Sequence, residues 1–449
     1  MNNKILTMQS KFIRHFFNKL NKSQINYCVW GNHESLPDDL NGSDLDIVVA
    51  RNNHLNFKLI LDDCLRQFSG KNVSYFDTQN SEHYRVAGIH EGDPWGIMID
   101  VIYEEFYYMD KIYLPSKWIR FFTTKHNEIN VNELGFSYLA GFLKELIHNG
   151  VVKDKYLTKT SLEIKSNPEK YKFFINDVYG EDFFNLLVAY FNNSKEEIDL
   201  GILQKTIKKS IRSSNIGVFK KKISKLERLI NPSPGFTIAF LGTDGSGKST
   251  IIENIKPTLS DAFHKTVYYE HMRPNKFPSI AELFGKKDNF NGPITNPHES
   301  EPSKLLVSLI RWAYYMIDYT LGYYLKVFPT KAIRSCVWIF DRYYYDYLID
   351  PKRVRINLPQ WILKIGQLLI PEPDIILCLG ANAATIHGRK PELPLKEVER
   401  QVTELKRFCN SHKRAIWIDT GKSIDVSSND ALEAILKVMA KRFDSIKLT

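Results

Sequence analysis

The stretch Gly242-Thr-Asp-Gly-Ser-Gly247-Lys248-Ser249 decides the fold of the C-terminal half. It matches the pattern G-x-x-x-x-G-K-[ST], in which glycines allow backbone N–H groups to surround phosphate oxygens. The apolar run FTIAFL precedes it and the helix-like run STIIENI follows it. The loop therefore leads from a strand into a helix N-terminus, where the helix dipole favours bound phosphate. This context predicts a nucleotide-phosphate site.

The chemistry of such a loop assigns roles to its residues. Lys248 can reach the β- and γ-phosphates of a nucleotide, and the Ser249 hydroxyl can bind Mg²⁺. Asp341, at the end of the apolar run VWIFD, is expected to supply a second metal ligand. ATP and Mg²⁺ are thus the expected cofactors. The residues expected to bind the nucleotide are Gly242, Thr243, Asp244, Gly245, Ser246, Gly247, Lys248, Ser249 and Thr250.

Apolar runs on either side of the loop indicate the fold class. FTIAFLG, TVYYEHM, VWIFDR, DIILCLG and AIWIDT alternate with segments of helical length, which predicts an α/β domain with a five-stranded parallel sheet covered on both faces. The breaker cluster NPSPG at 231–235 marks its start, so the domain is expected to span 231–449.

The N-terminal part has a different pattern. Short β-rich runs (INYCVWG, DLDIVVA, VSYFDT, HYRVAGIH and WGIMIDVIY) and one helix-like run, HLNFKLILDDCLRQF, predict an α+β domain over 1–120. Helical periodicity then dominates, as in LGFSYLAGFLKELIHNG, and predicts a helical region and basic connector over 121–230.

Carboxylates interrupt the apolar runs of the N-terminal part. Asp44 and Asp46 lie two residues apart, so in a strand they share one face, and Asp100 in GIMIDVIY is the natural third ligand. Paired carboxylates of this kind can chelate two Mg²⁺ ions for attack on a nucleotide α-phosphate. An unrelated strand with exposed aspartates would give the same pattern.

Cations follow two of the C-terminal strands. Arg342 comes directly after Asp341, and the run His387-Gly-Arg389-Lys390 follows DIILCLG. On a mobile segment, Arg389 and Lys390 could close over a transferring phosphoryl group and exclude water. A solvated basic loop is the alternative.

Residues 236–441 resemble the thymidylate kinase group of P-loop nucleoside monophosphate kinases. GTDGSGKST is similar to that group's phosphate loop, FDRYYYDYLID to its Asp-Arg-Tyr segment, HMRP to its Arg-Glu-Pro segment and PEPDIILCLG with HGRK to the strand leading to its lid. The resemblance implies that Asp244 faces the acceptor, that Arg273 and Arg342 hold it, and that Arg389 stabilises charge in the transition state. Catalytic roles are therefore expected for Lys248, Asp341, Arg342, Arg389, Asp244 and Arg273.

The acceptor side departs from that group. NKFPSIAELFGKK replaces the glycine-rich continuation after Arg-Glu-Pro, and the thymine-contacting Ser-Ala-Tyr-Gln stretch is absent. The region after the Asp-Arg-Tyr segment contains Asp346, Asp350, Lys352, Arg353 and Arg355. The acceptor is accordingly expected to be a nucleoside monophosphate or another small phosphorylated or hydroxylated molecule.

The segment Cys28-Val-Trp-Gly31-Asn32 followed by Asp44-Leu-Asp46-Ile resembles the nucleotidyltransferase superfamily. That superfamily has a glycine turn, a spacer and then Asp-h-Asp-h, but Asn32 stands where a small residue is usual. An active transferase and a degenerate or regulatory domain both remain open. A bifunctional kinase and nucleotidyltransferase that activates sugars or polyols for surface polysaccharide is therefore one alternative function.

Composition narrows the remaining classes. The 449 residues are 43% hydrophobic and 25% charged, which excludes fibrous and wholly disordered chains. Five scattered cysteines indicate buried thiols in a reducing compartment. The first residues lack the pattern of a secretory signal, so we expect a cytoplasmic protein. The hydrophobic region 305–328 contains Arg311, Asp318 and Lys326, so we expect no transmembrane segment there.

A net charge of +10 favours anionic partners, and nine basic residues gather between Lys205 and Arg228. A solvated helical connector is the favoured interpretation of that stretch, with nucleic acid or anionic lipid contact as the other. Few aromatic residues lie in this stretch to stack on bases, so nucleic acid is not the expected partner. The second alternative function is nevertheless a nucleotide-gated regulatory or nucleic-acid-binding protein. The sequence does not decide whether the chain forms a homodimer.

Overall fold

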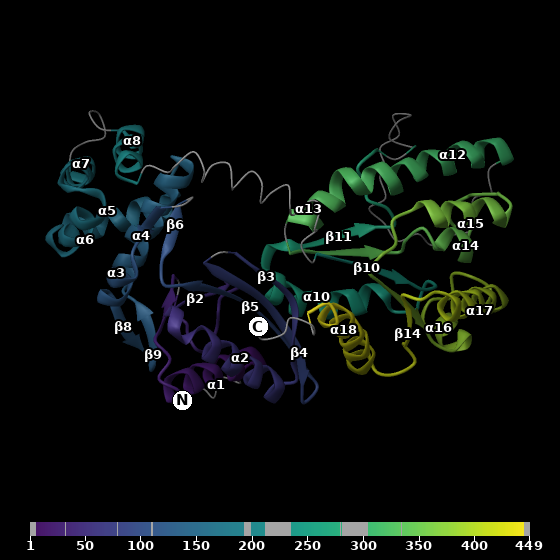
Figure 1. The fold of residues 1–449 in the computed structure, drawn as a ribbon. Helices are drawn as coiled ribbons and strands as arrows, with labels where there is room; N and C mark the ends of the chain where they lie inside the picture. The colour runs from purple at the N-terminus through teal and green to yellow at the C-terminus, as the bar shows by residue number, and fades with distance from the viewer. Residues whose placement is uncertain are drawn as a thin grey trace.

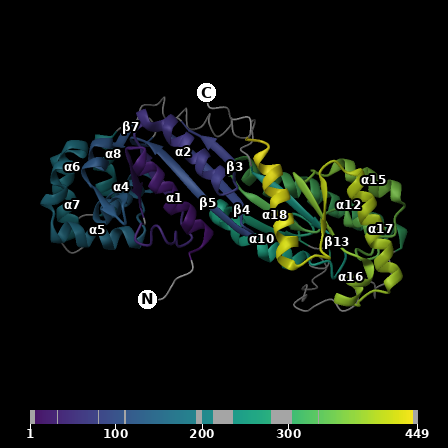
Figure 2. The same cartoon turned by 90° about the horizontal axis from the view of Figure 1, so that it is seen from below.

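The structure is a computed structural model that describes residues 6–31, 33–78, 80–108, 111–192, 199–211, 235–278, 280, 304–333 and 335–443. Asn32, much of the basic stretch after Ile211 and most of the NKFPSIAELFGKK segment lie outside the described residues. A mixed sheet occupies the middle of the molecule, with a helical region at one end and a parallel α/β region at the other (Figures 1 and 2).

The first sheet contains seven strands in the order β3-β4-β5-β2-β1-β9-β8. Their bounds are β1 (Tyr27–Trp30), β2 (Leu45–Val49), β3 (Gly70–Asp77), β4 (Ser81–His90), β5 (Asp93–Tyr103), β8 (Thr123–His126) and β9 (Ile129–Asn132). Helices α1 (Met8–Lys22) and α2 (His54–Gln67) bury their apolar sides on one face, in a core that includes Phe12, Phe16 and Ile99. The five predicted N-terminal strands are confirmed, and the sheet continues to Asn132.

Helices cover part of the other face of this sheet. They are α3 (Ser116–Phe121), α4 (Leu134–Asn149), α5 (Asp154–Ser166), α6 (Glu169–Tyr179), α7 (Glu181–Asn192) and α8 (Leu200–Ser210), beside a small hairpin of β6 (Phe106–Tyr108) and β7 (Lys111–Leu114). The predicted stop of α4 is confirmed, because Gly150 caps it in the left-handed region at φ 73°.

The second sheet contains five strands in the order β11-β12-β10-β13-β14, all parallel. Its strands are β10 (Phe236–Leu241), β11 (Val267–His271), β12 (Val337–Asp341), β13 (Ile375–Gly380) and β14 (Ala415–Asp419). Because β10, β12 and β13 are buried along their whole length, their runs are apolar without alternation. The predicted α/β class and the five parallel strands are confirmed.

Helices lie on both faces of this second sheet. Helices α10 (Lys248–Phe263) and α18 (Ile424–Ala440) pack on one face with the short turn η2 (His264–Thr266) beside them. The other face is covered by α12 (Leu305–Ile317), the π-helical η3 (Asp318–Val327), α13 (Phe328–Ile333), α14 (Asp346–Ile349), α15 (Gln360–Leu369) and α17 (Leu395–Ser411), and α16 (Ala383–Arg389) packs beside α17.

The two sheets share helices α10 and α18. Val73 of β3 and Ala87 of β4 belong to the same buried cluster as Ile251 and Ile255 of α10. Gly96 of β5 lies against the backbone of α10 so closely that a Cβ there would clash with the carbonyl oxygen of Thr258. Helix α10 is therefore covered on one side by its own sheet and on the other by the N-terminal sheet.

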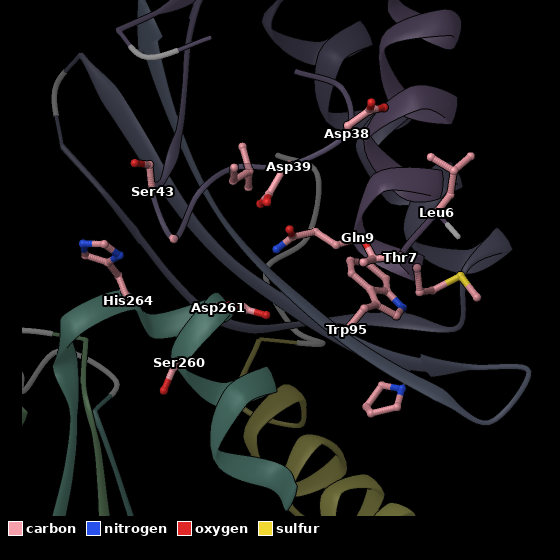
Figure 3. A pocket seen from close by; sticks show the side chains of 14 residues that line it. Leu6, Thr7, Gln9, Asp38, Asp39, Ser43, Trp95, Ser260, Asp261 and His264 are labelled. Atoms are coloured by element: carbon pink, nitrogen blue, oxygen red, sulfur yellow. The ribbon is translucent and has the colours of Figure 1, made fainter. Parts of the chain in front are cut away.

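A cavity of about 370 Å³ lies beside this contact. Figure 3 shows Asp261 pointing from α10 toward Gln9 and Trp95 of the N-terminal part, and Asp39 also lines the cavity. Burial, with a smaller contribution from the charge of Asp39, raises the pKa of Asp261.

All five cysteines are buried and free, as the sequence predicts. Among the described residues, no helix combines the length and apolar character that crossing a bilayer requires.

Candidate functional site

The phosphate loop joins β10 to α10, and its glycines permit its shape. Gly245 and Gly247 have φ of 81° and 86°, a region that side chains with a Cβ rarely adopt. Lys248 is the first residue of α10, so the loop places the N-terminal amide groups of that helix around the space that phosphates would occupy.

Three buried polar atoms around the loop have no hydrogen-bond partner among the residues that the structure describes. They are Thr243 Oγ1, Ser246 Oγ and Asp341 Oδ1. Burying a polar atom without a partner costs about 1–3 kcal/mol, so a cluster of such atoms needs an explanation such as a missing ligand or ion. The other carboxylate oxygen of Asp341 accepts a hydrogen bond of 3.0 Å from the Tyr269 hydroxyl.

The residues around the loop fit Mg²⁺. Asp341 ends β12, which neighbours β10 in the sheet, with Phe240 and Asp341 in register. Oxygen ligands from a carboxylate and a hydroxyl suit this ion, and the unpaired Asp341 Oδ1 together with the exposed Ser249 would supply them.

Lys248 is buried and donates to the loop itself. Its Nζ donates to the carbonyl oxygens of Gly242 at 2.8 Å and Thr243 at 3.0 Å. Burial, and then the positive charge of Arg342, lower the pKa of Lys248 to about 7, although nearby carboxylates including Asp244 oppose this. The ammonium group is therefore positioned at the loop but is poorly stabilised in the absence of anions.

An ion-pair network links the loop to the end of β12. Arg342 donates to Asp244 at 2.7 Å and to Asp346 at 2.5 Å, and Arg353 donates to the second oxygen of Asp244. Burial would raise the pKa of Asp244, but the charges of Arg342, Lys248 and Arg353 lower it well below its usual range. Asp244 is thus ionised and held by two arginines.

The backbone of Arg342 explains how its side chain reaches the loop. Arg342 has φ of 73°, an uncommon conformation for a non-glycine residue. Its N–H donates to the carbonyl oxygen of Phe240 at 2.9 Å, so Arg342 still pairs with β10 directly after the end of β12. Such backbone strain persists where surrounding contacts hold it, often at functional sites.

Arg273 is fixed by a buried carboxylate that the sequence analysis did not single out as a site residue. Its NH1 donates to Asp318 at 2.6 Å, and its guanidinium lies 5.0 Å from the centre of the Tyr315 ring. Asp318 is fully buried and also accepts from the backbone N–H groups of Asn275 and Lys276. The isolated aspartate inside an apolar helical run was the available signal, because a buried charge needs a partner.

Arg389 and Lys390 lie at the end of helix α16. Arg389 donates to the carbonyl oxygen of Thr420 at 2.8 Å, in the loop after β14, and Lys390 pairs with Glu392 at 3.0 Å. The helix packs on the phosphate loop, since a Cβ on Gly245 would lie 2.9 Å from the carbonyl oxygen of Ile386. In this structure Arg389 is directed to the Thr420 loop, and the proposed closure over the phosphates stays a prediction.

The three N-terminal carboxylates come together on the first sheet. Asp46 and Asp100 are in register on the parallel strands β2 and β5, and Asp44 directly precedes β2. One ligand atom from each of the three lies within 4.8 Å of the others. Burial, and then the charges of Asp44 and Asp100, raise the pKa of Asp46 well above its usual value. Carboxylates this close repel one another unless a cation separates them, so their oxygens could hold a divalent metal.

Two basic side chains on β4, Arg85 and His83, also reach this cluster. Arg85 NH1 lies 2.9 Å from Asp100 Oδ1, and His83 Nδ1 lies 3.0 Å from the same atom. Burial would raise the pKa of Asp100, but His83 and Arg85 lower it. Their spacing of two residues in a predicted strand was a signal that they share a face, although strand pairing had to be known before they could be placed next to Asp100.

Helix α10 separates the two sites. Its first residue, Lys248, belongs to the phosphate loop, whereas its later residue Thr258 lies against β5, the strand that carries Asp100.

The five-stranded all-parallel sheet belongs to a mixed α/β architecture and is consistent with a P-loop kinase fold. Neither the protein-family models nor the curated proteins contain a match to the chain.

Solved structures give partial likenesses. The chain is similar to the thymidylate kinase from Candida albicans at 17% identity, over 46% of this chain and 93% of that one, with a TM-score of 0.33. It is similar to the thymidylate kinase from Ehrlichia chaffeensis at 16% identity, over 45% of this chain and 100% of that one, with a TM-score of 0.30. Each likeness covers less than half of this chain.

Proposed function

We propose that the C-terminal α/β region is an ATP- and Mg²⁺-dependent phosphotransferase. The observation that carries the proposal is the set of unpaired buried atoms, Thr243 Oγ1, Ser246 Oγ and Asp341 Oδ1, gathered around a loop that also contains Lys248. Triphosphate oxygens and a divalent ion would provide the missing partners.

In phosphoryl transfer, some of these residues would position the reacting groups and others would stabilise negative charge. The loop amides and Lys248 bind the β- and γ-phosphates, and Ser249 and Asp341 hold Mg²⁺, which when bound neutralises charge on those oxygens. An acceptor oxygen attacks the γ-phosphorus, the bond to the β–γ bridging oxygen breaks, and ADP leaves. Arg342 lies at the loop through its pair with Asp244 and stabilises the transferring group.

The acceptor is proposed to bind between the loop and the arginines beyond β12. Asp244 is held by Arg342 and Arg353 and can accept a hydrogen bond from a hydroxyl of the acceptor. Arg273 follows the end of β11 by two residues. A nucleoside monophosphate or another small phosphorylated or hydroxylated molecule suits this mixture of carboxylate and guanidinium groups.

Product analysis tests the proposal. Purified protein is incubated with ATP, Mg²⁺ and a panel of nucleoside monophosphates, sugar phosphates and polyols, and products are identified by mass spectrometry. We expect ADP and one phosphorylated acceptor, both lost in Lys248→Ala and both retained in the control Lys256→Ala, an exposed lysine on the same helix. Full activity of Lys248→Ala would overturn the proposal, and slow ATP hydrolysis with no phosphorylated acceptor would favour the nucleotide-gated alternative.

A second function is proposed for the N-terminal sheet. The Asp44, Asp46 and Asp100 cluster supports metal-assisted nucleotidyl transfer, in which an acceptor attacks the α-phosphorus of a nucleoside triphosphate and pyrophosphate leaves. We expect pyrophosphate release that disappears in Asp44→Asn/Asp46→Asn and persists in Asp62→Asn, an exposed carboxylate on α2. ADP as the single nucleotide product would confine catalysis to the phosphate-loop site.

A further inference from the structure

Cys378 of β13 and Cys409 of α17 point into the same buried core. Side chains alternate along β13, so Leu377 belongs to the core shared with α10 and α18, whereas Cys378 belongs to the core on the other face of the sheet. Helix α17 covers that other face, and Leu405 and Cys409 lie on its buried side. The strand and the helix therefore direct the two thiols toward each other.

The sulfur atoms of these two residues are in contact. The Cys378 thiol donates a hydrogen bond to the Cys409 sulfur, across the interface between the strand and the helix. Cys28 and Cys64, by contrast, lie in two other buried clusters, in the N-terminal part of the chain. A disulfide requires two sulfurs that can meet without a large backbone movement, and the contact between Cys378 and Cys409 meets that requirement.

The two thiols differ in reactivity. The hydrogen bond from Cys378 lowers the pKa of Cys409, although burial opposes this, and the same hydrogen bond together with burial raises the pKa of Cys378. Burial raises the pKa of Cys28 and of Cys64 to about 12. Cys409 also keeps 8% of its surface exposed, whereas Cys378 is fully buried. Cys409 is therefore the thiol of the pair that a small oxidant meets first and that more readily becomes a thiolate.

We propose that Cys378 and Cys409 form a redox modification site, which hydrogen peroxide converts into an intramolecular disulfide. The Cys409 thiolate attacks one peroxide oxygen, so that an S–O bond forms, the O–O bond breaks, and the leaving hydroxide takes up a proton to become water. The Cys378 sulfur then attacks the Cys409 sulfur, the S–S bond forms, the S–O bond breaks, and the second hydroxide leaves as water with the proton of Cys378. The two thiols together lose two electrons, which reduce the peroxide to two molecules of water.

The disulfide would fasten the last turn of α17 to the second sheet. The ring of chain that it closes contains the whole of α16, which ends at Arg389. A reducing compartment keeps such a pair as two thiols, so the bond would form under oxidative conditions and be reversed afterwards.

Mass spectrometry of the full chain tests the proposal. The folded protein is treated with hydrogen peroxide, the remaining thiols are blocked with N-ethylmaleimide, and the chain is digested without reductant. We expect one disulfide-linked pair of peptides, containing Cys378 and Cys409, that dithiothreitol removes. Cys409→Ser should lose this pair, and the matched control Cys336→Ser, which alters another buried cysteine of the same core, should retain it.

A second variant tests the order of the two steps. Cys378→Ala cannot form the disulfide, so peroxide should leave a sulfenic acid at Cys409, which dimedone labels. Alanine brings no buried hydroxyl, and circular dichroism of each variant checks that the fold is kept. The proposal would be overturned if the linked pair were absent from the folded, peroxide-treated chain, or if it formed only after unfolding in urea. Dimedone labelling of the unmodified chain at Cys378 in place of Cys409 would contradict the assigned roles.

Discussion

Lys248 combines two requirements that conflict when the phosphate loop is empty. Its side chain must lie within the loop, and there burial lowers its pKa to about 7. Bound phosphates would favour the ammonium form by direct charge attraction. Protonation of Lys248 and nucleotide binding are therefore expected to be coupled.

This coupling gives a pH dependence of known sign. Above pH 7 the empty loop contains mainly neutral Lys248, so nucleotide binding must take up a proton, and affinity falls as pH rises from 7 to 9. Below pH 7 the lysine is already charged and this dependence disappears. Calorimetric titration with MgATP at pH 8 in buffers of different ionisation enthalpy measures the proton uptake. Lys256→Met should retain the uptake and Lys248→Met should lose it; equal uptake in both would contradict the coupling.

We expect Arg353 to contribute to acceptor binding by positioning Asp244, and not only through its positive charge. It holds Asp244 together with Arg342, whereas Arg355, two residues later, forms no ion pair within the described residues. Arg353→Met should lower kcat/KM for the acceptor by about tenfold to a hundredfold through loss of positioning, with a smaller effect on ATP binding. Arg355→Met is the control, measured in the same steady-state assay, and an equal loss in both variants would argue against positioning through Asp244.

At the scale of elements, the sequence was sufficient for individual strands and helices. The run FTIAFL is apolar at every position except Thr237 and forms β10, and the helix ending before Gly150 was recognisable from its periodicity and stop. The sequence did not show which strands pair with one another or which helices pack on each face of a sheet. Asp46 and Asp100 are 54 positions apart, and only the parallel pairing of β2 with β5 brings them together.

The site shows the same division between local and non-local information. The loop glycines and Lys248 are adjacent in sequence, so a pattern finds them. The pairs Arg353–Asp244 and Arg273–Asp318 join segments that are distant in sequence. A buried charge predicts that some oppositely charged partner exists, but the sequence does not show which residue that partner is. The orphaned Asp341 Oδ1 is likewise a property of packing and has no sequence signature.

The contact between β5 and α10 provides a stability prediction for one element pair. Gly96→Ala should destabilise the chain by about 1–3 kcal/mol, because the added methyl clashes with the Thr258 carbonyl and neither backbone can move freely. Gly388→Ala in α16 is the control, since nothing lies within 4 Å of its Cβ position. Urea unfolding measures both, and an unchanged midpoint for Gly96→Ala would show that the two backbones separate easily.

At the scale of the whole molecule, the two halves share a core. Val73 and Ala87 from the first sheet are fully buried in the cluster formed by α10 and α18. Separating the halves would expose that cluster on both sides, so the stability of each half includes the contact with the other.

A shared core predicts joint unfolding. Differential scanning calorimetry of the full chain should give one transition for both sheets, and a fragment starting at residue 235 should unfold at a lower temperature than the full chain does. Gly96→Ala should shift that single transition as a whole. Two well-separated transitions in the unmodified chain would show that the halves unfold independently.

The burial of α10 between two sheets also has a consequence during synthesis. The strands β3, β4 and β5 are synthesised by residue 103, whereas the two helices that cover them, α10 and α18, end at residues 263 and 440. At about 5–20 residues per second, this face of the nascent sheet waits roughly ten to thirty seconds for α10 and roughly twenty to seventy seconds for α18. Val73 and Ala87 therefore mark a surface that chaperones encounter before the phosphate loop exists, and slow translation between these segments would lengthen that exposure.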